Sequence, residues 1–234
     1  MTMQVGMVAN DAIILATDTL ANREPRTDLQ IRCIRQTFGT SKVRVSSDNK
    51  IAVTCARDLI QAYTLADALI AGLTPEHWAS PEGRMREIAW SEINSQHWRG
   101  AECLVALVDP YPALFLLQCA KTAQNTEESV CHPIVTYAFA GDSSNCSSYW
   151  AMRYFDSLSS ESMTVETLLP LAAQVVVDAK TFNSGTVSGL EIVICDRSGV
   201  RRFTQQENTG QYEAALSRSR EIEAVMFRRN NNAT

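Results

Sequence analysis

The first eighteen residues constrain the fold more than any other stretch, because they place the start of the chain inside a sheet. Two apolar runs, Met3–Val8 and Ala12–Thr17, are separated by an Asn-Asp step, and the acid Asp18 follows them. Asn and Asp tolerate the left-handed backbone of a tight turn, so the pattern predicts a β-hairpin. Most chain termini fray, whereas a strand that begins directly after Thr2 would fix this one.

Hairpins and consecutive helices dominate the rest of the pattern. Further strands are predicted at 42–45, 50–55, 103–108, 113–119, 134–140, 190–195 and 200–204, with a short strand near 31–34 and a polar loop at 124–129. Helices are predicted at 58–72, 81–96, 164–179 and 211–229, with another near 150–155. This order favours an α+β fold of mainly antiparallel sheets with helices on their outer faces. We expect one domain over residues 1–229 and a disordered polar tail at 230–234.

The charge and hydropathy of the chain argue against two classes of partner. The formal net charge is −5, which disfavours nucleic acid as the main partner. No run approaches the about 20 apolar residues of a membrane span. The first residues also lack the basic region and apolar core of a signal peptide. We therefore expect a cytoplasmic protein with neither a nucleic-acid nor a membrane partner.

Cysteine and histidine usage gives no sign of a metal or disulfide framework. The chain has seven cysteines, an odd number, and no pair has C-x-x-C spacing. A reducing compartment is favoured, and no cofactor or metal is expected. His77, His97 and His132 are scattered and are interpreted as core or surface residues rather than catalytic ones.

Thr2 is the first candidate catalytic residue. Met before a small residue such as Thr favours removal of the initiator Met, which would leave a hydroxyl and a free α-amine on one residue. An α-amine has a pKa of about 7.7–8, so a good fraction is neutral near pH 7. It can therefore act as the general base for its own hydroxyl. The alternative is that a penultimate Thr indicates Met removal and nothing more.

Lys42 and Asp18 are the candidates for a cation that tunes this amine and a carboxylate that holds the cation. A nearby positive charge lowers the pKa of an amine and favours its neutral, basic form. Asp18 ends the strand that pairs with the Thr2 strand, and Lys42 opens the next predicted strand. In the competing interpretation, Asp18 only ends a strand and Lys42 is a solvated charge on an edge strand.

An ordered set of short segments resembles the β-type subunits of the proteasome superfamily of N-terminal nucleophile hydrolases, including their bacterial homologues. Thr2 is followed by Ala16-Thr17-Asp18-Thr19, which is similar to the family's Ala-Asp-Thr segment. Lys42-Val43 and Lys50-Ile51 resemble its Lys-apolar and Lys-Ile steps, and Ser184-Gly185 resembles its Ser-Gly step. The resemblance extends in order from Thr2 to about residue 204.

The resemblance implies a four-layer αββα sandwich, assembly into a homo-oligomeric ring, and threonine-type peptidase activity. Peptides or unfolded proteins would be the substrates, and an unfoldase is a plausible partner. Thr2 would be the nucleophile, Lys42 would tune its amine and Asp18 would orient Lys42. The backbone N–H of Arg57, where the family usually has Gly, would be the oxyanion donor, and Ser184 would help to hold the terminus.

The sequence departs from the family around the terminal amine. Leu20 stands where the family often has Arg, and Thr181 stands where it often has an acid. We hypothesise that Asp142 supplies the missing carboxylate from another element, although Asp142 could instead be a helix N-cap. Because fold does not decide function, two alternatives remain: an inactive structural ring protein, or an amidohydrolase acting on a small molecule.

Overall fold

The predicted hairpin opens the chain. In the computed structural model, which describes residues 2–23, 36–95, 100–121, 127–141, 152–182 and 187–226, strand β1 (Met3–Val8) pairs antiparallel with β2 (Ala12–Thr17). Both strands are almost entirely buried. The start of the chain is therefore held by a strand inside the molecule.

The turn of this hairpin is stabilised differently from our prediction. Among described residues other than glycine, positive φ occurs at Asn49 and Arg57 but not at the Asn-Asp step. Instead, the backbone N–H of Asn10 donates to the carbonyl of Met163 at 2.8 Å, and its side-chain amide donates to the carbonyl of Ser160 at 3.1 Å. Hydrogen bonds to a segment distant in sequence, rather than residues with left-handed backbone, therefore stabilise the turn.

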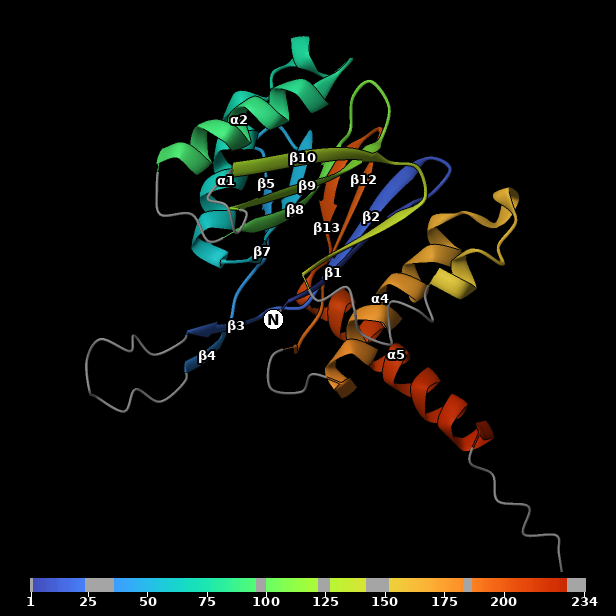
Figure 1. Cartoon of the computed structure of the whole chain (residues 1–234). Coiled ribbons are helices and arrows are strands. Elements are labelled where there is room, and N and C mark those ends of the chain that lie inside the picture. Colours follow the sequence, from blue (N-terminus) through green and yellow to red (C-terminus); the bar gives the residue numbers. More distant parts are fainter. Residues whose placement is uncertain are drawn as a thin grey trace, which may run out of the picture.

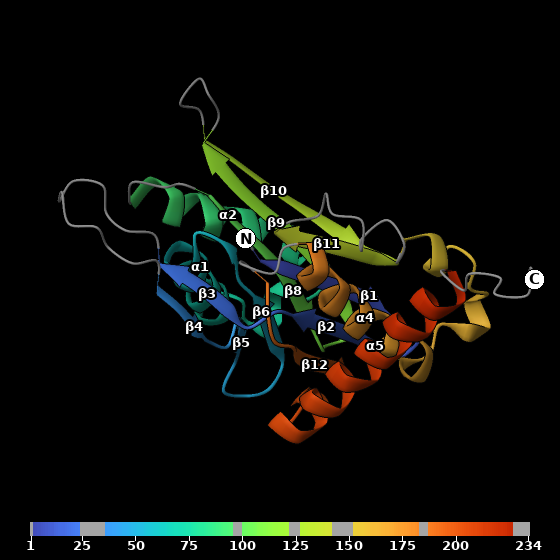
Figure 2. The ribbon, with the colours of Figure 1, turned by 90° about the horizontal axis from the view of Figure 1, so that it is seen from below.

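Two antiparallel sheets form the body of the protein (Figure 1). The five-stranded sheet has the order β11 (Tyr137–Gly141), β1, β2, β12 (Glu191–Asp196) and β13 (Gly199–Arg202). The six-stranded sheet has the order β10 (Glu127–Ile134), β9 (Ala113–Lys121), β8 (Ala101–Leu107), β6 (Ile51–Thr54) and β5 (Val43–Val45), and β7 (Ala56–Arg57) also pairs with β8. A separate ribbon pairs β3 (Leu20–Arg23) with β4 (Gln36–Gly39) and projects from one end of the body (Figure 2).

Helices cover the outer faces of both sheets, so the protein is α+β as predicted. Helices α1 (Leu59–Gly72) and α2 (Pro81–Ser95) pack on the six-stranded sheet. Helix α4 (Val165–Phe182) packs on the five-stranded sheet and carries α5 (Gln205–Met226) on its far side (Figure 1). Short 3₁₀ turns occur at Pro75–His77 and Ser160–Ser162.

The start of α1 shows how the sequence determines a boundary. Asp58 is the N-cap, as predicted, and its carboxylate accepts the backbone N–H of Gln61 at 3.2 Å. This bond satisfies one of the N–H groups that lack a partner at the start of a helix. The cap fixes the chain direction immediately after Arg57, which becomes important at the candidate site.

Three buried clusters hold these layers together. One joins the two sheets face to face and includes Ile13 and Leu15 of β2, Val193 of β12, and Leu104 and Leu114 of β8 and β9. The second lies between the six-stranded sheet and helices α1 and α2. The third lies between the five-stranded sheet and α4. Apolar burial of this kind is the main favourable term in folding. The cluster between the two sheets, called the middle cluster below, therefore fixes how the sheets pack on one another.

The region after β9 corrects the sequence prediction. The segment predicted as a loop at 124–129 contributes its last three residues to β10, and the strand predicted at 134–140 is two strands, β10 and β11, separated by Val135 and Thr136. Helix α5 also begins at Gln205 rather than 211. The short strand predicted near 31–34 and the tail at 230–234 lie outside the described residues.

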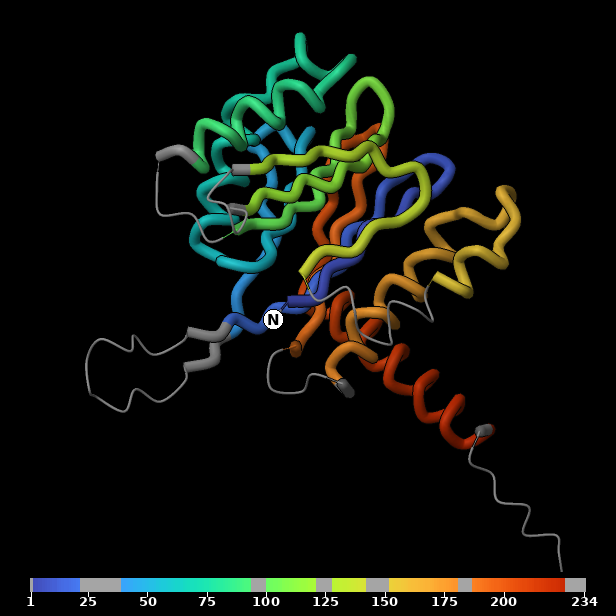
Figure 3. The backbone as a smooth tube through the Cα atoms, viewed as in Figure 1, coloured from blue at the N-terminus to red at the C-terminus, as the bar shows by residue number. Residues whose placement is uncertain are grey.

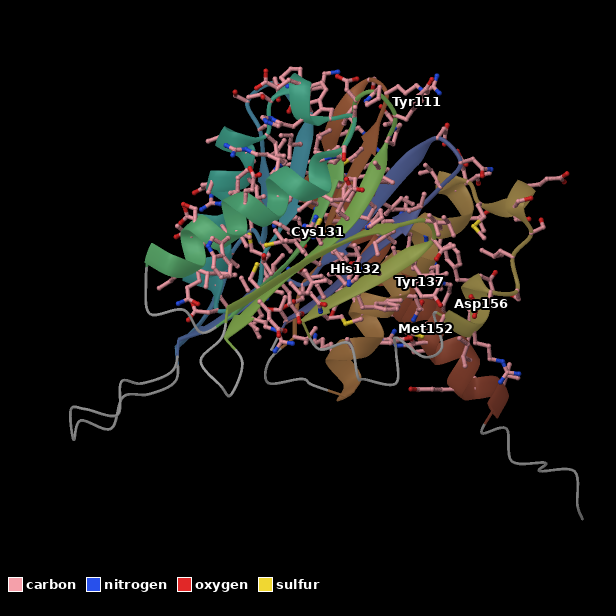
Figure 4. All side chains as sticks on the ribbon, turned by 45° about the horizontal axis from the view of Figure 1, so that its top comes forward. Tyr111, Cys131, His132, Tyr137, Met152 and Asp156 are labelled. Carbon is pink, nitrogen blue, oxygen red and sulfur yellow. The ribbon has the colours of Figure 1, made fainter. Side chains whose placement is uncertain are left out.

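Aromatic side chains pack around the first residue of β11. Tyr137, its first residue, meets the ring of Phe155 edge-on at a centroid distance of 4.8 Å and the ring of Phe139 at 5.6 Å. Figure 4 shows Tyr137 beside Met152 and Asp156, and burial together with Asp156 raises the pKa of Tyr137. This contact packs the start of β11 against the helical residues 152–155.

No helix within the described ranges is both long and apolar enough to cross a bilayer.

The middle cluster gives a stability prediction. Leu104→Ala, at a fully buried position between the sheets, should lower the free energy of unfolding by about 2–5 kcal/mol, because it removes apolar contacts and leaves a cavity. Ile60→Ala, where the side chain is 78% exposed, is the control and should cost less than about 0.5 kcal/mol. Urea denaturation measures both, and similar losses would contradict the proposed position of the core.

Candidate active site

Three of the residues predicted from the sequence meet at one end of the two sheets. The ammonium nitrogen Nζ of Lys42 donates to Thr2 Oγ1 at 2.9 Å and to Asp18 Oδ2 at 2.8 Å. Lys42 and Asp18 are at most 1% exposed and Thr2 is 8% exposed. The ammonium therefore bridges a hydroxyl and a carboxylate away from bulk water.

Backbone pairing places these groups together. Thr2 directly precedes β1 and Asp18 directly follows β2, so the antiparallel hairpin brings them to the same end. Asp18 Oδ1 accepts the N–H of Met3 at 2.9 Å, and Oδ2 accepts the N–H of Leu20 at 3.1 Å. Leu20, which departs from the family pattern in its side chain, thus still contributes a backbone donor.

Lys42 reaches this point from the other sheet. It directly precedes β5, and its carbonyl accepts the N–H of Cys55 at 2.8 Å. Its own N–H donates to Glu191 Oε2 of β12 at 3.0 Å. The lysine backbone is thus tied to both sheets, which directs its side chain toward Thr2.

Burial shifts the pKa of both members of the ion pair. Desolvation raises the pKa of Asp18, and the charge of Lys42 and the hydrogen bonds from Lys42, Met3 and Leu20 oppose that shift. Desolvation lowers the pKa of Lys42, and Asp18 opposes it. Each charge is therefore maintained by the other, since burial disfavours both charged forms.

Arg57 adopts a backbone conformation that is usual for glycine. Its φ is +70°, a left-handed value that is uncommon for residues other than glycine. Such strain costs on the order of 1 kcal/mol and is concentrated at functional sites. The backbone here is of the kind that glycine usually supplies, although the residue is arginine.

Glu102 is a residue that the sequence analysis did not identify. It lies in β8, is 6% exposed, and pairs through Oε1 with the guanidinium of Arg57 at 2.5 Å. Its second oxygen accepts the N–H of Gly141 at 2.7 Å. Gly141, with φ of +87°, packs so closely on Thr2 that an added Cβ would overlap the Thr2 carbonyl. A single carboxylate thus connects the Arg57 segment to the residue that touches Thr2.

Gln4 makes a second polar connection that was also missed. Its amide nitrogen donates to the carbonyl of Cys55 at 2.6 Å, and its amide oxygen accepts the hydroxyl of Thr54 at 2.6 Å. Thr54 Oγ1 in turn accepts the N–H of Leu104 at 3.0 Å. The available signal for Gln4 and Glu102 was a polar residue inside an otherwise apolar strand, because such a group needs a buried partner.

Two predicted site residues, Asp142 and Ser184, lie outside the described residues. For Thr181, where the family often has an acid, the structure describes the backbone, within α4, and not the side chain. The described site therefore consists of Thr2, Lys42 and Asp18, with Arg57 joined to them through Glu102 and Gly141.

Three of the described thiols are poor candidates for a competing nucleophile. Burial raises the pKa of Cys119 and of Cys195 to about 12, and that of Cys131 to about 11. Because the thiolate is the reactive form, these groups are inert near neutral pH.

Over the described ranges, no three His, Cys, Asp or Glu side chains converge so that they could hold a metal ion.

Comparison with known proteins adds no family to this geometry. The chain matches no protein-family model and no curated protein. The function of the protein is therefore inferred from the site residues described above.

The buried ion pair gives a pH-dependent prediction. Lys42→Met keeps much of the side-chain volume but leaves Asp18 buried without a counter-ion, so the free energy of unfolding at pH 8 should fall by about 3–5 kcal/mol. The loss should be smaller at pH 5. Without the Lys42 charge and hydrogen bond, which oppose desolvation, the pKa of Asp18 should be raised further than in the wild type. The folded variant then binds a proton that the unfolded chain releases, so its stability relative to the wild type decreases as pH rises above the ordinary aspartate value.

Urea denaturation at both pH values checks this prediction. Lys50→Met is the matched control, because Lys50 pairs with Asp109 at 3.0 Å while both side chains are about one-third exposed. It should change stability by no more than about 1 kcal/mol. Equal losses for Lys42→Met at pH 5 and pH 8 would show that Asp18 is not the group responsible.

Proposed function

We propose that this protein is a threonine-type N-terminal nucleophile hydrolase that cleaves peptide amide bonds, with Thr2 as its nucleophile after removal of Met1. The observation that carries the proposal is the position of the Lys42 ammonium, 2.9 Å from Thr2 Oγ1 and 2.8 Å from Asp18 Oδ2 in a buried site. Burying an ion pair costs free energy that an apolar pair of similar volume would not. A buried Lys42–Asp18 pair held against the Thr2 hydroxyl therefore supports a chemical role for the lysine.

The chemistry would proceed by acyl transfer. Thr2 Oγ1 bonds to the carbonyl carbon of the substrate while its proton passes to the free α-amine of the same residue. The amide C–N bond then breaks, and the leaving nitrogen takes that proton. Water hydrolyses the resulting ester and releases a carboxylic acid, which regenerates Thr2.

Lys42 and Asp18 support this sequence electrostatically. In the structure the Lys42 ammonium donates to Thr2 Oγ1, which leaves the hydroxyl proton of Thr2 free to be taken by a base. The same charge stabilises negative charge on Oγ1 and lowers the pKa of a nearby amine, so more of that amine is in the basic form. Asp18 keeps the ammonium in place.

The backbone N–H of Arg57 is the proposed oxyanion donor. Its left-handed conformation and its place at the end of β7, directly before the N-cap of α1, support this role. A fixed donor aimed at the developing oxyanion can contribute a factor of about 10²–10³ in kcat. The four-layer sandwich of the family is a further part of this proposal and is supported by the sheet and helix order. A homo-oligomeric ring and an unfoldase partner are also parts of the proposal and rest on the resemblance alone.

Covalent capture of Thr2 tests the proposal directly. Intact mass should show loss of Met1, and incubation with a peptide β-lactone should add one acyl group that peptide mapping assigns to Thr2. Thr2→Ala should form no adduct and should keep its fold. If Met1 is retained or no adduct forms, the protein is not an enzyme of this type and the structural-protein alternative is favoured.

The pH dependence of reaction at Thr2 is a separate prediction. The rate of reaction with a peptide epoxyketone should rise with an apparent pKa below about 7.7–8, the ordinary α-amine range, because the Lys42 charge favours the neutral amine. It should fall again at alkaline pH, below the ordinary lysine value of 10.5, because burial lowers the pKa of Lys42. The rate at each pH is measured by quenching the reaction at set times and determining the fraction of adduct by mass spectrometry. A rate that does not change from pH 6 to 10 would contradict this prediction.

A further inference from the structure

A buried carboxylate outside the proposed catalytic group suggests how the strained backbone of Arg57 is maintained. Glu102 has two oxygens with different partners: Oε1 meets the Arg57 guanidinium at 2.5 Å, and Oε2 accepts the Gly141 N–H at 2.7 Å. A third donor, the side-chain amide of Gln118, approaches Oε1 at 3.3 Å. A charged hydrogen-bond acceptor of this kind gives strong and directional bonds.

Both ends of this connection lie at the proposed reaction centre. The Arg57 end carries the proposed oxyanion donor with φ of +70°. The Gly141 end lies opposite Met3 in the pairing of β11 with β1 and touches the Thr2 carbonyl. Figure 3 shows β11 ending beside the start of β1. Glu102 therefore spans the distance between nucleophile and oxyanion donor, which belong to different sheets.

Backbone pairing around Arg57 is short, although the Asp58 cap fixes the helix that follows it. In the pairing of β7 with β8, Arg57 lies opposite Ala101, and β7 is two residues long. The next backbone bond, from Asp58 N to the carbonyl of Gly100, is long at 3.4 Å. The Arg57 side chain is 56% exposed, whereas the Glu102 side chain is 7% exposed, so the buried carboxylate is the fixed partner and the arginine is held by it.

We propose that Glu102 is a positioning residue for the proposed hydrolysis: its ion pair with Arg57 and its bond from the Gly141 N–H set the oxyanion donor against Thr2. This inference rests on the proposed function. The charge of Glu102 compensates for an arginine at a position where the backbone favours glycine, so the two residues act as a unit. Removing the charge should misplace the donor without moving Thr2, Lys42 or Asp18.

The test uses Glu102→Gln, which keeps an oxygen for the Gly141 N–H and removes the charge that holds Arg57. The rate of acylation of Thr2 by a peptide β-lactone should fall about 10- to 100-fold, less than for complete loss of an oxyanion donor. A peptide aldehyde, whose adduct places an oxyanion in the same position, should inhibit more weakly by a similar factor, while KM for a peptide substrate changes little. A purely structural defect would not weaken aldehyde inhibition in step with the rate.

Three further substitutions sharpen the test. In an Arg57→Gly background, the Glu102→Gln substitution should cost less than about threefold, because glycine adopts positive φ without a side-chain partner. Glu213→Gln, an exposed site on α5, is the matched control and should react at the wild-type rate. If Glu102→Gln fails to fold, Arg57→Gln, at an exposed side chain, breaks the same pair and should show the same loss.

The outcomes separate this inference from the proposed function. If the wild-type protein forms no adduct at Thr2, both fail. If the wild-type protein reacts and Glu102→Gln reacts at the same rate, the proposed function stands and the role of Glu102 is refuted. An equal loss in the wild-type and Arg57→Gly backgrounds would refute it too, since Glu102 would then act without Arg57.

Discussion

The buried contact between Lys42 and Asp18 is the interaction on which the site depends. Neither charge is stable alone in a dry environment, because desolvation shifts both pKa values toward the neutral forms. The pair is maintained because Asp18 also accepts two backbone N–H groups, which an antiparallel hairpin and the residue after it supply. A site of this kind requires that the start of the chain be ordered, which is what β1 provides.

The two sheets divide the chemistry between them. Thr2 and Asp18 flank strands of the five-stranded sheet, whereas Lys42 flanks β5 and Arg57 ends β7 of the six-stranded sheet. Their spacing therefore depends on the apolar cluster between the sheets and on the polar connections made by Gln4 and Glu102. Apolar packing resists changes in volume but is weakly directional, so hydrogen bonds supply the orientation that catalysis would need.

The sequence predicted those helices and strands whose pattern of apolar and polar residues matches which of their faces are buried. The opening hairpin, the cap at Asp58 and the helices α1, α2 and α4 were all predicted to within a few residues. The prediction failed at β10, whose first residues, Glu127–Ser129, are polar or charged. This strand lies at the edge of the sheet, where half-exposed residues need not be apolar, so hydropathy carried no strand signal.

The sequence by itself determined the fold class and proposed Thr2, Lys42 and Asp18, because strand order and hairpin geometry limit which residues lie near a terminus. Only the tertiary structure decided that the three are in contact, since Lys42 approaches from the other sheet. It also revealed the left-handed Arg57 and its partner Glu102. The positions of those residues depend on side-chain contacts between strands far apart in sequence, and local patterns carry no information about such contacts.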